Sequence, residues 1–396
     1  MTIFKLSSTV IIIIIIITVF TIFVGSTHKK EGETWPETDI TFSMGHYPTS
    51  YCRMTNIILD TQEKVFKYRK VENDNSLKKT CLFTDDIWPF VNVASNITSV
   101  PACDVKFNKG HVFTMYYFFG SNYFHLHYDM MLPLYSAVHR LPQGQLKDVV
   151  FMPSVESRRL QYINWETEAF KRPAYWMEML KVLTRPHTVM PLDSDLIQQG
   201  KTICMKVAYF GTPSIDIENI DLINSYVKFI KTRLGVAHNR VNSTLIGIIS
   251  RSTRRKILNE QELLKEVSKF SAVEMVEFTG KTFKEQIECV QKYSVLVGVN
   301  GAGLTNAMFL SPGAVAVQLV PFNATVNYKT FAQILQCRGP YLEWHNRHSN
   351  LTHESRHDTY RSAPDTTVHA QEFVGLMKQA LSLVNSDPHA YYKTEL

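Results

Sequence analysis

The stretch VLVGVNGAGLTNAMFLSPGAVAVQLVPF, from Val295 to Phe322, decides the fold class of this chain. An apolar run meets the tight sequence Asn-Gly-Ala-Gly, and a short apolar segment, Pro-Gly and a second apolar run follow. We predict strands over 294–299 and 314–320, with a short helix over 303–310 between them. The glycines let the backbone turn tightly, and the first amides of the helix can donate hydrogen bonds to an anion.

The preceding sequence shows a similar alternation. The segments TLIGIIS (244–250) and AVEMVEF (272–278) are typical of strands. Each is followed by a predicted helix, at NEQELLKEVSKF (259–270) and FKEQIECVQKY (283–293). Strands that alternate with helices at this spacing predict an α/β fold with a parallel sheet.

Two segments lie at the carboxyl edge of this sheet, where ligands bind in parallel α/β folds. Ser250 and Arg251 follow the first strand, and Asn300 and Gly301 follow VLVGV. Arginines add fixed positive charge and paired donors that suit phosphate. A glycine turn alone indicates packing more often than binding. Together with the arginines it favours a diphosphate site that needs no metal.

A second candidate site is NYFHLHYD, from Asn122 to Asp129. On a strand, His125, His127 and Asp129 would all face one metal ion, as in metallohydrolases with an H-x-H-x-D run. The apolar residues around and after this run recur near helical spacing, and on a helix His125 and Asp129 share a face while His127 lies off it. A histidine–carboxylate pair suits a general base. The alternative is a structural Asp129 inside an aromatic core.

The sequence Asp-Ser-Asp at 193–195 matches the D-x-D metal motif of many nucleotide-sugar transferases. Three residues match such a motif easily by chance. Because this one follows Pro191 in an irregular stretch outside the regular sheet, we interpret it as a loop.

The composition is that of a globular protein. The chain has 396 residues, 45% apolar and 20% charged, with a formal net charge of +6. This length has room for two domains of usual size. No long basic run is present in the sequence, so a nucleic acid is not favoured as a partner.

The amino terminus predicts targeting to the secretory pathway. Residues 6–24 carry no charge and are rich in isoleucine, and lysines flank them on both sides. This length lies between a signal peptide and a short membrane span, so cleaved and anchored forms both stay open. The flanking lysines do not settle the orientation of an anchored form.

Other features agree with a lumenal location. The six cysteines lack C-x-x-C spacing, which favours disulfides over zinc. The chain ends Lys-Thr-Glu-Leu, close to the K-D-E-L signal that a retrieval receptor reads in the endoplasmic reticulum. Four sequons predict N-glycosylation, at Asn96, Asn242, Asn323 and Asn350.

Three motifs together resemble glycosyltransferase family 61: SRSTRRKILNEQEL from Ser250, GVNGAGLTNAMFLSP from Gly298, and NYFHLHYD. The resemblance covers most of residues 50–380. It implies a GT-B architecture, with two Rossmann-like domains that face each other across a cleft and the donor held by the second. We expect the chain to divide into a targeting segment, a linker, an acceptor-side α/β domain, a nucleotide-sugar-binding domain and a tail, at 1–26, 27–45, 46–238, 239–380 and 381–396.

The resemblance also implies roles for residues. Arg251 and Arg255 would hold the phosphates of UDP, with Arg254 as a rival for the second role. Asn122, His125 and Asp129 would lie on the acceptor side, with Asp129 or His125 as the catalytic base. The turn and the helix it opens would complete the donor site, through Asn300, Gly301, Ala302, Gly303 and Leu304.

The implied reaction is an inverting, metal-independent transfer from a UDP-sugar to a hydroxyl of a glycoprotein or glycan. N-acetylglucosamine is the expected sugar because similar members of the family transfer it, and other members transfer xylose or arabinose. The expected location is the lumen or membrane of the endoplasmic reticulum, as a type II protein if anchored, with the Golgi membrane as an alternative.

One departure from the family pattern bears on activity. The family has a histidine where this chain has Asn300. Asparagine can donate a hydrogen bond, but it cannot take up a proton or a charge near pH 7. A second hypothesis is therefore a non-catalytic protein that keeps the fold and binds a glycoprotein.

Overall fold

The computed structural model is a mixed α/β structure with parallel strand pairings in both large sheets. The targeting segment, the D-x-D sequence, Arg254 and the carboxyl-terminal tetrapeptide lie outside the residues that the structure describes. The described residues are 36, 39–43, 51–63, 65–69, 92–95, 102–115, 122–139, 148–155, 175–190, 192, 200–211, 220–240, 242–252, 255–322, 335, 339–353 and 364–386.

The C-terminal unit (residues 242–386) is built on the predicted parallel sheet. Its strand order is β10-β9-β11-β12-β13, and each neighbouring pair is parallel. In chain order this is 2-1-3-4-5, the order of a doubly wound sheet, whose ligand-binding switch point lies between the first and third strands, here β9 and β11. The strands are β9 (Ile246–Ile249), β10 (Val273–Val276), β11 (Val295–Val299), β12 (Val315–Val320) and β13 (Tyr341–His345).

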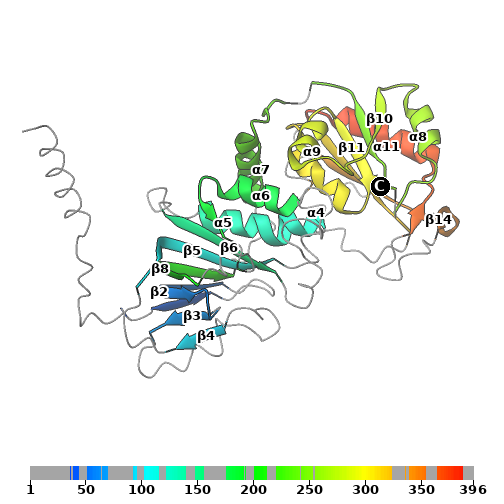
Figure 1. The fold of residues 1–396 in the computed structure, drawn as a ribbon. Coiled ribbons are helices and arrows are strands. Elements are labelled where there is room, and N and C mark those ends of the chain that lie inside the picture. The colour runs from blue at the N-terminus through cyan, green and yellow to red at the C-terminus, as the bar shows by residue number, and fades with distance from the viewer. Residues whose placement is uncertain are drawn as a thin grey trace, which may run out of the picture.

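Helices cover both faces of this sheet (Figure 1). The side chains of Val295, Val297 and Val299 pack on the face of α8 (Glu260–Val267) and α11 (Ala370–Leu383). Leu296 packs on the opposite face, against α9 (Phe283–Val290) and η4 (Ala302–Phe309). This alternation is why the strand is apolar throughout: both of its faces are buried. The predicted helix after the glycine turn is η4, which forms as a 3-10 helix.

The N-terminal unit (residues 39–240) differs from the Rossmann-like form that we expected. Its eight-stranded sheet has the order β4-β3-β2-β8-β5-β6-β7, and β1 also pairs with β2. The pairs β1–β2, β2–β3 and β2–β8 are antiparallel, so this sheet is mixed. The strands are β1 (Ile40–Ser43), β2 (Tyr51–Asp60), β3 (Val65–Tyr68), β4 (Asn92–Ser95), β5 (Val105–Met115), β6 (Val149–Val155), β7 (Thr188–Val189) and β8 (Thr202–Gly211).

Strand β1 corrects a second expectation. Residues 27–45 were predicted to form a linker, but Ile40–Ser43 pairs with β2 in antiparallel register. The sequence Ile-Thr-Phe-Ser alternates apolar and polar side chains, which is the pattern of a strand with one buried face. Because the residues before it are mostly polar, the whole segment was predicted to be a linker.

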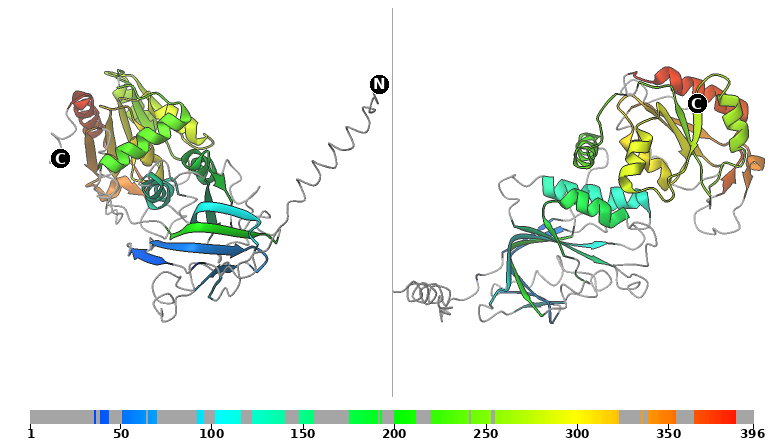
Figure 2. Two further views of the ribbon diagram at one scale, coloured as in Figure 1. Left: turned by 90° about the vertical axis from the view of Figure 1, so that its left-hand side faces the viewer. Right: turned by 45° about the horizontal axis from the view of Figure 1, so that its top comes forward.

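A layer of helices lies between the two sheets, as Figures 1 and 2 show from three sides. One helical run begins after Asn122 and is followed along the chain by two further helices. The helical elements are α4 (Tyr123–His125), η1 (Leu126–Met131), α5 (Leu132–His139), α6 (Tyr175–Thr184) and α7 (Ile220–Leu234).

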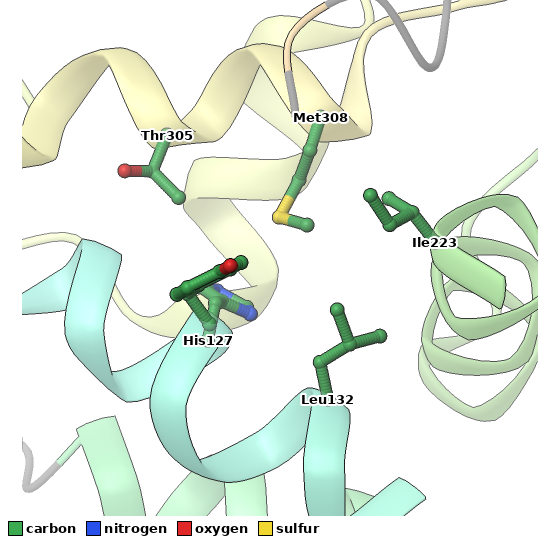
Figure 3. A pocket seen from close by; sticks show the side chains of 6 residues that line it. His127, Leu132, Ile223, Thr305 and Met308 are labelled. Carbon is green, nitrogen blue, oxygen red and sulfur yellow. The ribbon is translucent and has the colours of Figure 1, made fainter. Parts of the chain in front are cut away.

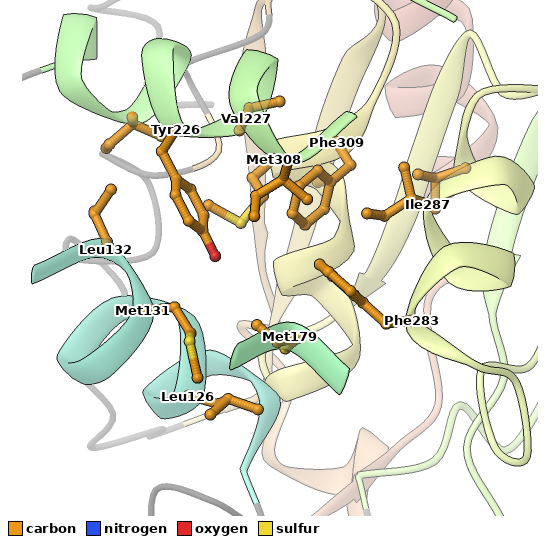
Figure 4. Packing of buried hydrophobic residues seen from close by; sticks show 14 of the residues in the cluster. Leu126, Met131, Leu132, Met179, Tyr226, Val227, Phe283, Ile287, Met308 and Phe309 are labelled. Carbon is orange, nitrogen blue, oxygen red and sulfur yellow. The ribbon is translucent and has the colours of Figure 1, made fainter. Parts of the chain in front are cut away.

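One apolar core joins the two units. Leu126, Met179 and Tyr226 from the helix layer belong to the same buried cluster as Phe283 and Phe309 of the C-terminal unit (Figure 4). Polar contacts cross at the same place. The backbone N–H of Phe283 donates to Glu178 Oε2 at 3.1 Å, and the buried Lys231 Nζ donates to Gln291 Oε1 at 2.6 Å. The relative position of the two units is therefore fixed by close packing on this side.

Remaining elements lie at the carboxyl edge of the parallel sheet. The short helix η5 (Ser349–Leu351) leads into β14 (Thr352–His353), which pairs with β15 (Asp365–Thr366). Among the described helices, none is long and apolar enough to cross a membrane.

Candidate functional site

The segment that follows β9 carries Arg251 and Arg255, and we call it the arginine loop. Arg251 and Arg255 are both half-buried at the carboxyl end of this strand. Arg255 Nη1 donates a hydrogen bond to the carbonyl oxygen of Asn300, 2.9 Å away, at the end of β11. The structure thus brings together the two segments that the sequence placed at one sheet edge, and it does so at the switch point between β9 and β11.

Gly301 allows this approach. A side chain built on Gly301 would collide with Nη1 of Arg251 and would come within 3.0 Å of Nη1 of Arg255. Both guanidinium groups therefore lie against the backbone of the glycine turn. At Gly303 a Cβ atom would meet only Ile249 Cγ2 at 3.5 Å and Phe278 at 3.8 Å, which are ordinary contacts. Of the two glycines, Gly301 is the one that close approach requires.

Asn300 is the least satisfied group at this edge. Its side chain is 2% exposed, and its backbone N–H donates to Leu319 O at 2.9 Å. Neither Oδ1 nor Nδ2 of its side chain has a hydrogen-bond partner within the described part of the protein. Both amide atoms are buried from solvent, as are those of Gln318 on the neighbouring strand β12, so this state alone does not mark a ligand contact.

The helix η4 extends this surface. Its first hydrogen bond runs from Leu304 N to Gly301 O. The N–H groups of Ala302 and Gly303 precede that bond and make none within the helix, as expected at a helix start. Leu304 itself is buried and packs in the core that joins the two units. Leu304 therefore anchors the helix, whereas Ala302 and Gly303 offer backbone donors.

Ser250 has a partner that the sequence did not suggest. Its Oγ donates to Glu260 Oε2 at 3.1 Å, across the base of the arginine loop. Burial raises the pKa of Glu260, and the neighbouring charge of Glu277 acts in the same direction, whereas the Ser250 hydrogen bond opposes them. Glu260 thus ties the start of the loop to the start of α8.

The second candidate site is helical, as the apolar spacing predicted. His125 Nδ1 lies 2.5 Å from Asp129 Oδ2, and both side chains are about one quarter exposed at 24% and 21%. The pair spans the junction of α4 and η1, and η1 is a π-helix. Single π-turns inside helices are frequent at functional sites. Asn122 caps α4 because its Oδ1 accepts a hydrogen bond from Phe124 N at 3.1 Å.

His127 points elsewhere, so the metallohydrolase alternative is wrong for this geometry. Its Nδ1 lies 2.9 Å from the hydroxyl of Tyr226, on the side away from the His125–Asp129 pair. No group of three or more histidine, cysteine or acidic side chains among the described residues is arranged to hold a metal ion. Complete burial lowers the pKa of His127 to about 3, so the imidazole is neutral near pH 7.

A small cavity of about 10 Å³ lies beside His127 (Figure 3). It lies between the helix layer and η4, and its volume is at the lower limit for one water molecule. The apolar parts of its lining make it a packing defect between the units rather than a sugar site. It is lined by His127, Tyr128, Leu132, Ile223, Thr305 and Met308.

The two halves of the candidate site are neighbours. Helix α4, which ends at His125, packs against η4, which opens the donor-side turn. The side chain that meets η4 is His127, whose ring packs 5.3 Å from that of Phe309, whereas His125 and Asp129 lie on another face of the same helical run. About 175 residues separate α4 from η4 in the chain, so local sequence patterns carry no information on their packing.

Comparison with known proteins gives the family. The sequence profile described as Glycosyltransferase 61 matches residues 90–317, more than half of the chain. The protein O-linked-mannose beta-1,4-N-acetylglucosaminyltransferase 2 of Mus musculus is 26% identical over 294 residues, which cover 66% of this chain and 48% of that protein. The EGF domain-specific O-linked N-acetylglucosamine transferase of Bos taurus is 25% identical over 261 residues, 58% of this chain and 47% of that protein.

The chain spans about half the length of these curated relatives. Among solved structures, the bacterial iron-containing dodecameric glycosyltransferase TibC from enterotoxigenic E. coli aligns over 90% of this chain and 98% of its own, with 10% identity and a TM-score of 0.30. That similarity is too low to support an argument about fold or site. The match to the family profile and the motifs on both sides of the site lead to one conclusion: the chain belongs to glycosyltransferase family 61.

Proposed function

We propose that this protein transfers a sugar from a UDP-sugar to a hydroxyl group of a protein or glycan, with inversion at the sugar carbon and without a metal ion. One observation carries the proposal. Arg251 and Arg255 lie against the glycine turn at the switch point of a doubly wound sheet, and the helix that carries the histidine–aspartate pair packs against η4 of that unit. In this view the N-terminal unit binds the acceptor and the C-terminal unit binds the donor.

The donor side suits a diphosphate. Arg251 and Arg255 bring two positive charges against the backbone of Gly301. These charges can offset the negative charge that develops on the departing UDP, which is the task of the cation in metal-dependent transferases. The backbone amides of Ala302 and Gly303 add neutral donors.

The acceptor side suits proton removal. We assign the base to His125, with Asp129 orienting it, because His125 Nδ1 faces the Asp129 carboxylate and its Nε2 therefore lies on the opposite edge of the ring. The acceptor hydroxyl loses its proton to Nε2 while its oxygen bonds to the anomeric carbon. The bond from that carbon to the UDP oxygen breaks, and its electron pair leaves with UDP.

The donor and acceptor are proposed from the relatives. Both named relatives are N-acetylglucosaminyltransferases by name, one acting on O-linked mannose and one specific for EGF domains. We propose UDP-N-acetylglucosamine as the donor of this chain and a glycoprotein as its acceptor. A UDP-xylose or UDP-arabinose donor is the alternative within the family.

A secretory location fits the described residues. Cys103 and Cys204 form a disulfide, and Cys52 is also disulfide-bonded, whereas Cys289 is a free thiol. Stable disulfides favour an oxidising lumen. Of the four sequons, Asn242 and Asn350 are exposed, and Asn96 and Asn323 lie outside the described residues. We propose the endoplasmic reticulum as the location.

A non-catalytic role is the second candidate, and Asn300 is the observation that favours it. An amide cannot give a proton to the leaving diphosphate, so a site that depends on a histidine there would bind UDP without turnover.

The test is turnover by the protein with a panel of UDP-sugars, with and without EDTA, beside the Asn300→His variant. EDTA-resistant consumption of one UDP-sugar, with transfer to a glycoprotein, supports the proposal and names the donor. If the natural protein binds UDP without turnover and the Asn300→His variant gains turnover, the non-catalytic alternative is established. Failure of both proteins to bind any UDP-sugar or UDP would reject the proposed transferase.

A further inference from the structure

The arginine loop is held from outside by a segment more than one hundred residues later in the chain. The backbone N–H of Lys256 donates to Asp365 Oδ1 at 2.8 Å, and Thr366 N donates to Lys256 O at 2.8 Å. Leu258 N donates to Thr366 O at 2.9 Å, and Ile257 forms a parallel bridge with Thr366. Strand β15 therefore lies along the loop directly after Arg255.

Arg255 has an unusual backbone. Its φ angle is +56°, in the left-handed region that long side chains rarely adopt. Residues stay in such a conformation only when their surroundings impose it, and such positions concentrate at ligand sites. Here the surroundings act from both sides, because Arg255 Nη1 is bonded to Asn300 O and the next N–H in the chain is bonded to Asp365.

The holding segment is itself rigidly placed. Thr366 is fully buried, and its Oγ1 accepts a hydrogen bond from Asn346 Nδ2 at 3.2 Å. Asn346 directly follows β13 and is 4% exposed. Asp365 is thus attached to the far edge of the same sheet that carries the arginine loop. A chain of hydrogen bonds leads from β13 through β15 to the backbone beside Arg255.

We propose that Asp365 is a positioning residue: its carboxylate, on the N–H of Lys256, sets the left-handed turn that aims Arg255 at the donor diphosphate. This inference rests on the proposed function, in which Arg255 holds that diphosphate. Asp365 itself does not touch the donor. Its loss should therefore weaken donor binding through Arg255 and leave proton transfer at His125 unaffected.

The experiment measures UDP affinity by calorimetry, and KM and kcat for the donor, in Asp365→Ala, Asp365→Asn, Arg255→Ala and the double variant Asp365→Ala/Arg255→Ala. Loss of one hydrogen bond to a charged acceptor should raise the Kd of UDP about tenfold in Asp365→Ala. KM should rise in parallel while kcat changes little. Asp365→Asn keeps an acceptor oxygen and should recover most of the affinity. In the Arg255→Ala background, Asp365→Ala should add little, since the two residues act in series.

A matched control separates positioning from general loosening. Asn259 holds the same segment by two other hydrogen bonds. Its Nδ2 donates to Val368 O at 2.8 Å, and its Oδ1 accepts from Val368 N at 3.0 Å. Asn259→Ala should lower the thermal unfolding midpoint about as much as Asp365→Ala but leave the Kd of UDP unchanged. Equal weakening of UDP binding by both variants would overturn the inference, as would full additivity of Asp365→Ala with Arg255→Ala.

Hydrogen–deuterium exchange tests the role of Asp365 without UDP, so its outcome is independent of the proposed transferase function. Asp365→Ala should speed amide exchange at residues 255–258 more than Asn259→Ala does. If the natural protein binds no UDP, the proposed function is rejected. Amide exchange over 255–258 then still tests whether Asp365 holds the arginine loop. Unchanged exchange over 255–258 in Asp365→Ala would show that Asp365 does not hold this loop.

Discussion

The two sides of the candidate site are built in different ways. On the donor side the chemical groups are set by backbone: two strands end side by side, a glycine admits two guanidinium groups, and a neighbouring strand fixes a left-handed turn. On the acceptor side they are set by the phase of a helix, because His125 and Asp129 are four residues apart and share one face where α4 continues into η1. Substitutions on one side should therefore change donor binding, and substitutions on the other side should change proton transfer.

The largest expected effect tests the acceptor side. His125→Ala should lower kcat by about 10²–10⁴-fold, the usual contribution of a general base, while the Kd of UDP stays the same. Asp129→Asn should cost less, because it removes the orienting carboxylate and keeps the imidazole. Single-turnover rates and calorimetry give the two numbers. If Asp129→Asn proves the more damaging variant, the carboxylate is the base and His125 its support.

The next effect tests the donor side. Arg251→Ala and Arg255→Ala should each raise the Kd of UDP about 10–100-fold, the loss expected for hydrogen bonds to a charged group. Arg53→Ala is the control, since this partly exposed arginine lies on the N-terminal sheet and pairs with Asp39. A similar loss of affinity in the control would mean that net charge, and not the site, attracts UDP.

Substitutions in the glycine turn test the donor side with a smaller expected effect on UDP binding. Gly301→Ala should weaken UDP binding by roughly 1 kcal/mol, about fivefold, because the new methyl group displaces Arg251. Gly303→Ala should lose less, because its methyl group makes ordinary contacts. Gly375→Ala is the control: it lies in α11 with open space around it and should only stiffen the helix. Equal losses at Gly301 and Gly303 would refute the steric account.

The last prediction concerns stability against pH rather than activity or UDP binding. Burial lowers the pKa of His127 in the joined core, and of His111 in the N-terminal sheet, to about 3 in each case. An unfolded histidine titrates near 6.5, so between these values the unfolded chain binds more protons and stability is lost as the pH falls. Each residue should contribute a slope of about 1.4 kcal/mol per pH unit.

Urea unfolding between pH 7 and pH 4 measures these slopes. His127→Gln and His111→Gln should each be less stable than the natural protein at pH 7 and should each show a shallower decline in acid. Slopes identical to that of the natural protein would mean that neither imidazole is held neutral by the fold.

The sequence predicted the parallel sheet well because its signals are local. Buried strands such as Val295–Val299 are continuous apolar runs, and the turn that follows needs Gly301. The phase of His125 and Asp129 also followed from nearby apolar residues. The mixed N-terminal sheet could not be predicted in this way, because β2 and β8 pair residues as distant as Cys52 and Phe210. Periodicity shows that a strand exists but carries no information about its neighbour.

The sequence by itself determined the fold class of the C-terminal unit, the edge at which Arg251 and Asn300 lie, and the helical pairing of His125 with Asp129. Only the tertiary structure decided that Asn300 is buried without a partner among the described residues, that Asp365 lies beside the arginine loop, and that one core joins the two units. The reason is physical. Turns and helix phase depend on backbone preferences over a few residues, whereas burial and long-range hydrogen bonds depend on which distant segments pack together.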